Sequence, residues 1–375
     1  MASQSNPELE ARILANPDDL SAYLVYGDWL SERDDPRGEL IAVQAKLHET
    51  PGDAALQATE KKLLADNAQA WLGTLADKGP KDLAITWKLG FIDSVRFGPP
   101  LDAYEWASID FVEALGIVLG LPGTAFIREL VFGSQESHDY PATWQNCIDA
   151  LVEHGTPKGL TRLELNRGGY WDISSTELGD LSKLYPQLSK LRELTIEMGS
   201  MELGAIDLPS LRSLEIVTGG LTTANLEAIA SAKWPSLERL SLCIGETDND
   251  YGCNVHLEDV KRLLEDGDLG RVRHLGLANT NLADEIAAML PETRILAQLE
   301  TLDLSRGTFG DEGARAILDN AAAYRHLKEI DLTHHYVSEE VGAELSKIGP
   351  RIILAEPEEA DEDGDEEYRY VQISE

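Results

Sequence analysis

The sequence predicts an α/β solenoid, with a parallel β-sheet on the inside of an arc and helices on the outside. Three observations predict it. A six-residue aliphatic pattern recurs through most of the 375 residues. Amphipathic stretches of helical length lie between the copies. A helix-rich segment of a different kind precedes the first copy. One strand and one helix cannot bury their apolar faces alone, so successive repeats must stack on one another.

The recurring pattern is L-x-x-L-x-L, and every copy begins with an aliphatic residue. Within each copy the last two aliphatic residues alternate with a polar residue, as in a short strand buried on one face. Successive copies begin 20 to 35 residues apart. Nine copies are present, and they begin at Ile92, Ile127, Leu160, Leu191, Leu211, Leu237, Val272, Leu299 and Leu327.

The intervals between copies predict the outer layer and the turns. Helical periodicity is clearest in residues 222–234, 256–267 and 311–324, where apolar side chains fall on one side. Glycine suits tight turns with positive φ but offers no side-chain hydrogen bond, so we expect irregular turns. In five repeats a glycine follows the strand, at Gly168, Gly199, Gly219, Gly245 and Gly307.

Nine copies in one register resemble leucine-rich repeats over roughly residues 85–350. Their length and helical intervals are similar to the ribonuclease-inhibitor-like subclass. The resemblance implies a leucine-rich repeat solenoid, a right-handed β-α superhelix with its parallel sheet inside and its helices outside. It also implies that the concave face of the sheet is available for binding.

The N-terminal segment carries three helix signals. We expect one helix to start at Asn16–Pro17, a second at Asp35–Pro36, and a third to run from about Ala54 to Leu75. The segments NPDDL, AYLVYGDWL and DPRGELI within residues 16–41 closely resemble the bacterial repeat-companion domain. That resemblance implies association with repeat arrays in bacteria. The module is either a small bundle that caps the solenoid or a docking unit, with a candidate face of Tyr26, Asp28, Trp29 and Arg37.

The pattern divides the chain into three expected parts. Residues 1–80 form the helical module, 81–355 a solenoid of about nine repeats, and 356–375 an acidic segment with a β-prone tail. Residues 81–98 predict an edge strand, a turn at Leu89–Gly90 and the first repeat. At the other end, RIILAEP and YRYVQISE could pair as a cap. Alternatively, YRYVQISE is a free tail that adds to a partner's sheet.

The charge of the chain restricts its partners. Lys and Arg number 32 and Asp and Glu 67, which gives a net charge of −35. Such a surface repels nucleic acid and anionic lipid and favours a protein with a basic surface. Residues 356–367 contain nine carboxylates and no basic residue. A run of this kind predicts a solvated, disordered loop.

Cysteine usage and the missing targeting signals predict a cytoplasmic protein. The three cysteines make no disulfide framework. The N-terminal residues lack the basic and apolar regions of a secretory signal, and no apolar run is long enough for a membrane span. We expect neither cofactor nor metal, and the sequence leaves the oligomeric state open.

The outward positions of the strands, together with the turns that follow them, form the candidate partner-binding surface. A solvated polar face is the alternative interpretation. Mixed charges and exposed aromatic residues favour a protein partner. Tyr140 and Tyr251 are further aromatic residues in turns. The candidates are Glu129, Arg162, Glu164, Tyr170, Trp171, Glu193, Glu197, Glu215, Arg239, His274, Asp303, Arg306, Glu329, Asp331, His334 and Tyr336.

These features predict a non-catalytic protein-interaction scaffold. A narrower alternative is an inhibitor or immunity-type protein that masks a basic enzyme. A third hypothesis is a hydrolase or metal site at His334 and His335, near Asp303 and Asp331. Adjacent histidines at a strand end usually point to opposite sides, which argues against it. Cys253-x-x-His256 has a ligand-like spacing, but no fourth ligand is apparent.

Overall fold

A computed structural model describes residues 5–100, 106–134, 142–168, 170–247, 252–363 and 366–373. The chain forms two compact units. The first holds Met1–Glu136 and Asp149–Glu164, and the second holds Ser137–Ile148 and Leu165–Glu375. The two units are defined by their internal contacts, and the boundary between them lies within the repeats. The part boundaries expected at 80/81 and 355/356 follow the sequence pattern and remain predictions.

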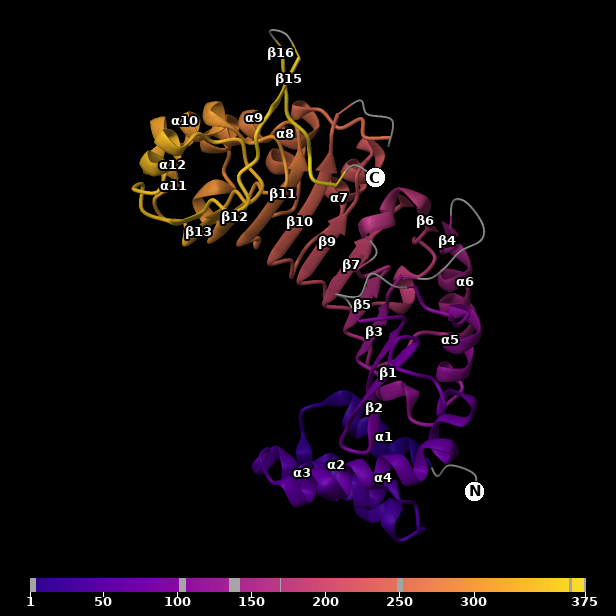
Figure 1. Cartoon of the computed structure of the whole chain (residues 1–375). Helices are drawn as coiled ribbons and strands as arrows, with labels where there is room; N and C mark the ends of the chain where they lie inside the picture. Colours follow the sequence, from indigo (N-terminus) through magenta and orange to yellow (C-terminus); the bar gives the residue numbers. More distant parts are fainter. Residues whose placement is uncertain are drawn as a thin grey trace. The chain divides into compact units, whose positions relative to one another are not determined.

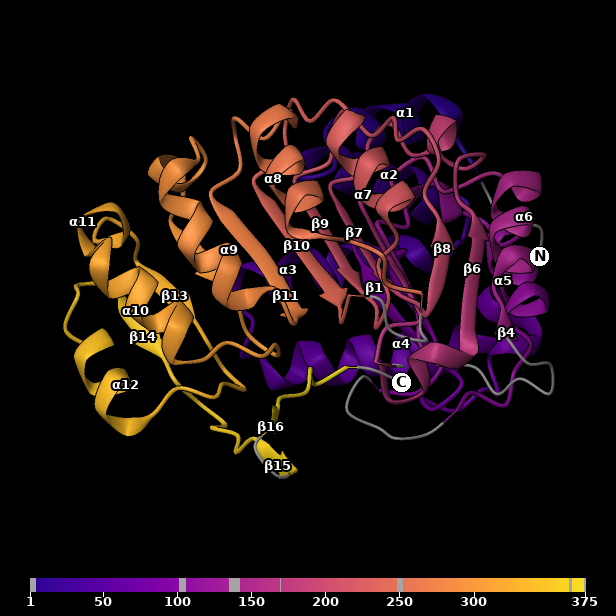
Figure 2. The same ribbon diagram turned by 90° about the horizontal axis from the view of Figure 1, so that it is seen from above.

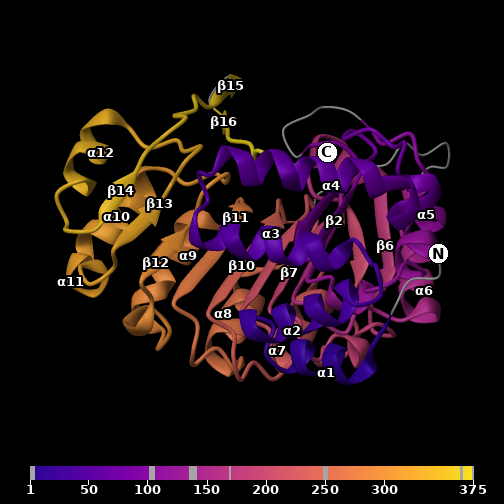
Figure 3. The ribbon, with the colours of Figure 1, turned by 90° about the horizontal axis from the view of Figure 1, so that it is seen from below.

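The first unit begins with helices that lie side by side (Figure 3). Their bounds are α1 Pro7–Ala15, α2 Leu20–Ser31, α3 Arg37–Glu49 and α4 Ala54–Leu72, followed by η1 Gly73–Leu75. The helix start expected at Asn16 and Pro17 is wrong, because Asn16 ends α1 and Asp19 caps α2. The same Asn-Pro signal occurs ten residues earlier, where Asn6 caps the unpredicted α1.

Helices α2 and α3 pack at very short distance through two glycines. A Cβ on Gly38 would lie 2.6 Å from the Gly27 carbonyl oxygen and 2.3 Å from Ser31 Oγ. Two of the four residues of the candidate docking face are buried here. Tyr26 has no exposed surface, and Arg37 is buried in an ion pair with Asp35 at 2.6 Å. The expectation that these two form a docking face is therefore wrong.

A β-hairpin joins the helices to the repeats, as expected. Strand β1 (Leu83–Lys88) runs antiparallel to β2 (Phe91–Phe97). Gly90 turns between them at φ 81°, where a Cβ would lie 2.4 Å from the Ile41 side chain of α3. Phe91 stacks on Tyr26 with ring centroids 5.4 Å apart. The helical module and the hairpin therefore share one core.

All nine copies of the aliphatic pattern form strands, so the predicted fold class is confirmed. The described strands of the main sheet follow the order β1-β2-β3-β5-β7-β9-β10-β11-β12-β13-β14, and the described pairings after β1–β2 are parallel. In the first unit lie α5 Phe111–Leu119, η2 Thr124–Phe126 and β3 Glu129–Phe132; α6 Gln145–His154 and β5 Arg162–Leu165 cross the division.

The sheet of the second unit contains seven further described strands. The leucines of the pattern are buried beneath it, as Leu240 and Leu242 illustrate with no exposed surface. Burial of this kind contributes about 25 cal/mol per Å² of apolar area. The strands are β7 Glu193–Glu197, β9 Ser213–Val217, β10 Arg239–Gly245, β11 His274–Thr280, β12 Thr301–Asp303, β13 Glu329–Asp331 and β14 Arg351–Ile353.

Helices cover one face of this sheet (Figure 2). They are α7 Thr223–Ser231, α8 Leu257–Asp266, α9 Ala283–Met289, α10 Asp311–Asp319, α11 Ala321–Tyr324 and α12 Glu339–Leu345, with η5 Leu290–Glu292 and η6 Leu296–Gln298. The three intervals with helical periodicity all form helices at α7, α8 and α10–α11, as predicted.

A second, three-stranded sheet forms the outer layer of the earlier repeats of this unit. It consists of β4 (Ala142–Thr143), β6 (Thr176–Asp180) and β8 (Ser200–Glu202), with η3 (Tyr170–Ser175) and η4 (Tyr185–Gln187) beside them. The prediction of a helix in every repeat is therefore wrong for the repeats that contain β6 and β8, whose described residues form no α-helix. The repeat of β8 is short, because the copies that begin at Leu191 and Leu211 are only 20 residues apart, and an extended segment returns in fewer residues than a helix.

The C-terminal residues differ from both expectations. Strand β14 pairs with β13 as an additional repeat. Strand β15 (Asp361–Asp363) in the acidic run pairs antiparallel with β16 (Glu366–Tyr368) at its end, so the predicted disordered loop is wrong for the paired residues of the run. Residues 369–373 fold back onto the second unit (Figure 1). These residues therefore do not pair with RIILAEP as a cap, and they do not form a free tail. Along the described ranges, no helix has both the length and the apolar character to cross a membrane.

Candidate protein-binding surface

The candidate surface of the second unit is the face of its main sheet opposite the helices, which we call the sheet face. Parallel pairing places the outward residues of neighbouring strands in rows. One row contains Glu193, Ser213, Arg239, His274, Thr301 and Glu329. The next contains Thr195, Glu215, Ser241, Gly276, Asp303 and Asp331. The structure thus brings seven of the sixteen candidates together in these rows, and Glu197 is an eighth on the same face.

The first row contains the most accessible charges. Glu193 and Arg239 are exposed, and Glu329 is half-buried in an ion pair with Arg351 at 2.9 Å. His274 Nδ1 lies 2.8 Å from Thr301 Oγ1. Burial lowers the pKa of His274, with the Arg239 guanidinium adding to the effect. The imidazole is therefore neutral at pH 7 and offers a hydrogen bond without a charge.

Glu197 belongs to a buried cluster that the sequence did not indicate. Its carboxylate accepts the Gly168 N–H at 2.6 Å and forms an ion pair with Arg167. Arg167 also lies 3.6 Å from Glu215. Burial raises the pKa of Glu197, although Arg167 and the Gly168 N–H oppose that rise. Glu197 is only 4% exposed, so it fixes the turn after β5 and contributes little contact area. Glu215 remains accessible, with 34% of its side chain exposed.

Asp303 and Asp331 cap the turns after their own strands. Asp303 Oδ1 accepts the Ser305 N–H at 2.9 Å, and Asp331 Oδ1 accepts the Thr333 N–H at 2.9 Å. Burial raises the pKa of Asp303, and the hydrogen bonds from Ser305 oppose the rise. Both carboxylates are half-buried. Their first role is therefore to hold the local turn, as short acidic side chains do in Asx turns.

His334 and His335 are both buried and contact neighbouring residues of the turn and the C-terminal part. His334 is 9% exposed with φ 61°, and its Nε2 lies 3.8 Å from Glu358. His335 Nδ1 accepts the Val337 N–H at 3.0 Å, and burial lowers the pKa of this ring. The described interactions of the two rings join them to Glu358, Val337 and Tyr336, not to Asp303 or Asp331. The acid–base hypothesis therefore gains no support from the geometry.

The remaining candidates lie elsewhere. In the first unit, Glu129 pairs in register with Arg162, and Arg162 forms an ion pair with the buried Glu164 at 2.5 Å. Tyr170 and Trp171 belong to η3, but their side chains lie outside the described part. Tyr140 and Tyr251 are also outside it. Arg306 and Tyr336 follow β12 and β13 and contact the C-terminal segment.

This C-terminal segment, residues 369–373, was missed as a part of the surface. It lies over the ends of the strands on the sheet face, where Ile373 packs against Val217, Cys243 and Ala278. The side chain of Asn279 binds the backbone of Ile373. The alternation of β-prone residues in YRYVQISE indicated an extended segment, but nothing in the sequence indicated its position.

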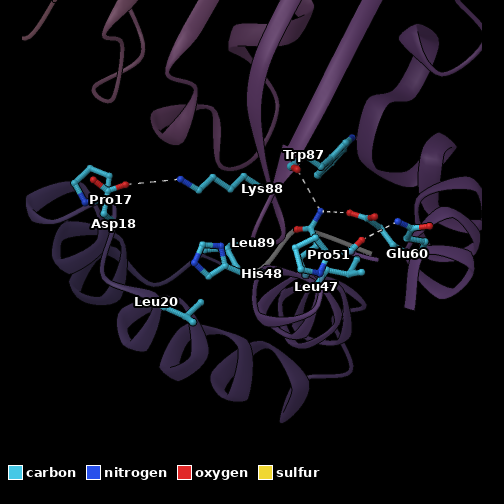
Figure 4. A pocket seen from close by; sticks show the side chains of 12 residues that line it. Pro17, Asp18, Leu20, Leu47, His48, Pro51, Glu60, Trp87, Lys88 and Leu89 are labelled. Carbon is cyan, nitrogen blue, oxygen red and sulfur yellow. Dashed lines mark hydrogen bonds and ion pairs between the residues drawn. The ribbon is translucent and has the colours of Figure 1, made fainter. Parts of the chain in front are cut away.

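The first unit contains a pocket of about 510 Å³ that the sequence also did not indicate (Figure 4). Such a volume lies in the range of small-molecule sites. Gln44 accepts the Gly90 N–H at 2.7 Å and donates to Glu60 at 2.7 Å, and Lys88 lies 3.8 Å from Asp18. Gln44 and Glu60, and likewise Lys88 and Asp18, are thus engaged with one another in the lining of the pocket. The lining residues are Pro17, Asp18, Leu20, Gln44, Leu47, His48, Pro51, Gln57, Glu60, Trp87, Lys88 and Leu89.

Among the described residues, no group of three or more His, Cys, Asp or Glu side chains is placed so that it could hold a metal ion. Cys243 and Cys253 are both buried, at 4% and 2% exposed. His256 is the N-cap residue of α8, where its backbone N–H donates to Asp259 at 3.0 Å. The motif Cys253-x-x-His256 therefore begins a helix in this fold.

Comparisons with known proteins support the fold. The sequence matches no protein-family model and no curated protein. The structure is similar to a protein of Bacteroides fragilis from a structural-genomics programme, with a TM-score of 0.61 and 24% identity over 85% of this chain and 86% of that one. An internalin from Listeria monocytogenes matches with a TM-score of 0.27 and 14% identity, over 78% of this chain and 94% of that one. The similarity to the Bacteroides fragilis protein shows a shared fold.

Proposed function

We propose that this protein is a non-catalytic, cytoplasmic interaction scaffold. It binds a partner protein with a basic surface on the sheet face of the second unit. The observation that carries the proposal is the register of the outward residues, which places Glu193, Glu215 and Glu329 in neighbouring rows on a face without helices. A repeat fold presents such a face for contact with another protein.

Electrostatics supports a basic partner. The net charge of −35 attracts a cationic protein over long range and raises the rate of encounter. Glu197 is buried and offers a partner little contact. On the sheet face the attraction comes chiefly from the more accessible carboxylates, Glu193 and Glu215.

A narrower form of the proposal is an inhibitor or immunity-type protein that masks a basic enzyme. The same net charge favours it. It requires an affinity that falls steeply with ionic strength, because masking of a cationic site depends on unscreened charge. Measurement of partner affinity across salt concentrations separates the two forms.

Affinity capture at low salt tests the proposal. The tagged wild type is compared with a variant carrying Glu193→Lys and Glu215→Lys. The matched control carries Glu258→Lys and Glu265→Lys, two exposed residues of α8 on the helix side. Both variants change the net charge equally. We expect one basic protein to be captured by the wild type and the control and lost by the sheet-face variant. Equal capture by all three would contradict the proposed site.

A further inference from the structure

The C-terminal segment crosses the sheet face from one repeat to the next. After β13, the Tyr336 hydroxyl accepts the Tyr370 N–H at 2.9 Å and donates to the Tyr370 carbonyl at 3.1 Å. After β12, the Gln372 N–H donates to the Arg306 carbonyl at 2.9 Å. The segment then reaches β11. Figure 1 shows its path from β16 across these strand ends.

Asn279 of β11 holds the segment by its main chain. Its Nδ2 donates to the Ile373 carbonyl at 2.7 Å, and its Oδ1 accepts the Ile373 N–H at 2.7 Å. Asn279 has no exposed surface and adopts a positive φ of 52°. One amide that satisfies both backbone groups of a residue can recognise a peptide of any sequence at that position.

The side-chain site beside Asn279 selects for aliphatic residues. Ile373 lies among Ile173, Val217, Cys243 and Ala278, and it is itself 6% exposed. Val371, two residues earlier, is also 6% exposed. The chain bends at Gln372, between these two residues, and both side chains are buried. The bound segment therefore has the pattern aliphatic-x-aliphatic, with backbone recognition at the second aliphatic residue.

We propose that this part of the sheet face is a binding site for peptide segments. In the free protein, residues 369–373 occupy it. The partner supplies a segment with the same aliphatic-x-aliphatic pattern, and this segment takes their place. This inference rests on the proposed function, because it assigns the partner's chemistry to the same face.

One feature supports a replaceable occupant. The hydrogen bonds that Tyr370, Gln372 and Ile373 make with the repeats come from backbone groups, so another sequence can reproduce them. Two side chains add contacts of their own: Arg369 forms an ion pair with Asp284 at 3.7 Å, and Ile373 packs in the aliphatic cluster. Because the segment is tethered, it competes with any free peptide at a high effective concentration, which lowers the apparent affinity of the wild type.

Peptide binding in trans tests the inference. The probe is a fluorescent synthetic peptide, YRYVQISE, with the sequence of residues 368–375. It is titrated into the full-length wild type and the full-length Ile373→Asp variant, whose own segment no longer fits the aliphatic site. We expect the variant to bind at least about tenfold more tightly than the wild type. The control peptide YRYVQDSE should not bind. Equal binding of the probe to both proteins, or to neither, would overturn the inference.

Cys243 provides a second readout that does not depend on affinity. It lies under Ile373, and burial raises the pKa of its thiol to about 12, which slows alkylation. Alkylation of each cysteine is followed by mass spectrometry. We expect Cys243 to react at least about tenfold faster in Ile373→Asp, and the probe peptide to restore its protection. Failure of the peptide to protect Cys243 would count against the site.

A further variant identifies the role of Asn279. In the Ile373→Asp background, Asn279→Ala should abolish peptide binding while the melting transition is retained. Unchanged binding would contradict backbone recognition by Asn279.

A wild type that sediments as a dimer, converted to a monomer by Ile373→Asp, would show that the segment is exchanged between copies and would overturn its replacement by a partner. A failed peptide test with intact partner capture would refute this inference and leave the proposed function standing.

Discussion

Several candidate residues are engaged in holding the turns of their own repeats. Asp303 caps the turn after β12, and Glu197 binds Arg167 and the Gly168 N–H. A short carboxylate in a strand–turn junction satisfies backbone donors that would otherwise be buried without a partner. At the scale of single residues, an outward position in the sequence is therefore insufficient evidence for a binding role.

Asp303 gives a pH-dependent prediction. Burial raises the pKa of this carboxyl, so its contribution to stability is complete below the ordinary value near 4 and is lost as pH rises through the raised value. Asp303→Asn keeps the acceptor and removes the charge. We expect the variant to gain about 1 kcal/mol relative to the wild type between pH 4 and pH 7. Urea unfolding at both pH values measures this change.

Glu300 serves as a control of opposite sign. A hydrogen bond from Lys328 lowers the pKa of this carboxyl. Its contribution is present above the ordinary pKa and is lost as pH falls through the lowered value. Glu300→Gln should therefore lose stability relative to the wild type as pH rises. If both variants changed in the same direction, the assignment of Asp303 would be wrong.

At the scale of elements, the packing of α2 on α3 depends on a glycine. Gly38→Ala places a methyl group against the Gly27 carbonyl and Ser31 Oγ, so the helices must separate. We expect a loss of about 1–3 kcal/mol in unfolding free energy, measured by thermal and urea unfolding. Gly52 has no atom within 4 Å of its added Cβ, so Gly52→Ala is the matched control and should be neutral. Equal effects would contradict this account of the packing.

Elements were predictable where one signal determines the local fold. Each copy of the aliphatic pattern predicted a strand correctly, because alternating aliphatic residues are buried on one face of a strand. Leu240 and Leu242 of β10 are an example. The positions of α7, α8 and α10 followed from helical periodicity in the same way. The helix N-caps could not be predicted from this signal alone. Asn6 and Asn16 both precede a proline, but of these two only Asn6 caps the start of a helix, α1.

The remaining features depend on contacts between distant residues. Asn279 and Ile373 are 94 positions apart, and no local pattern links them. Arg167 lies in a turn and gave no indication that it would bind Glu197. The outer strands β6 and β8 replaced helices because neighbouring repeats offered partners for extended backbone. Candidate residues could thus be placed on a face, but not separated into exposed and buried ones.

For the whole molecule, the acidic charge predicts how binding responds to salt. A partner steered by a net charge of −35 should associate faster at low ionic strength. We expect the association rate to fall at least about tenfold between 50 and 500 mM salt, with a smaller change in the dissociation rate. Surface plasmon resonance with the captured partner measures both rates. A rate independent of salt would contradict a basic partner and the inhibitor interpretation.

The most direct test of the central claim is the dissociation constant of the purified partner for three proteins, measured by calorimetry at one salt concentration. These are the wild type, the sheet-face variant with Glu193→Lys and Glu215→Lys, and the helix-side variant with Glu258→Lys and Glu265→Lys. We predict that the sheet-face variant binds at least about tenfold more weakly, and that the helix-side variant binds within about twofold of the wild type. Equal weakening in both variants would show that net charge alone attracts the partner and that the sheet face is not its binding site.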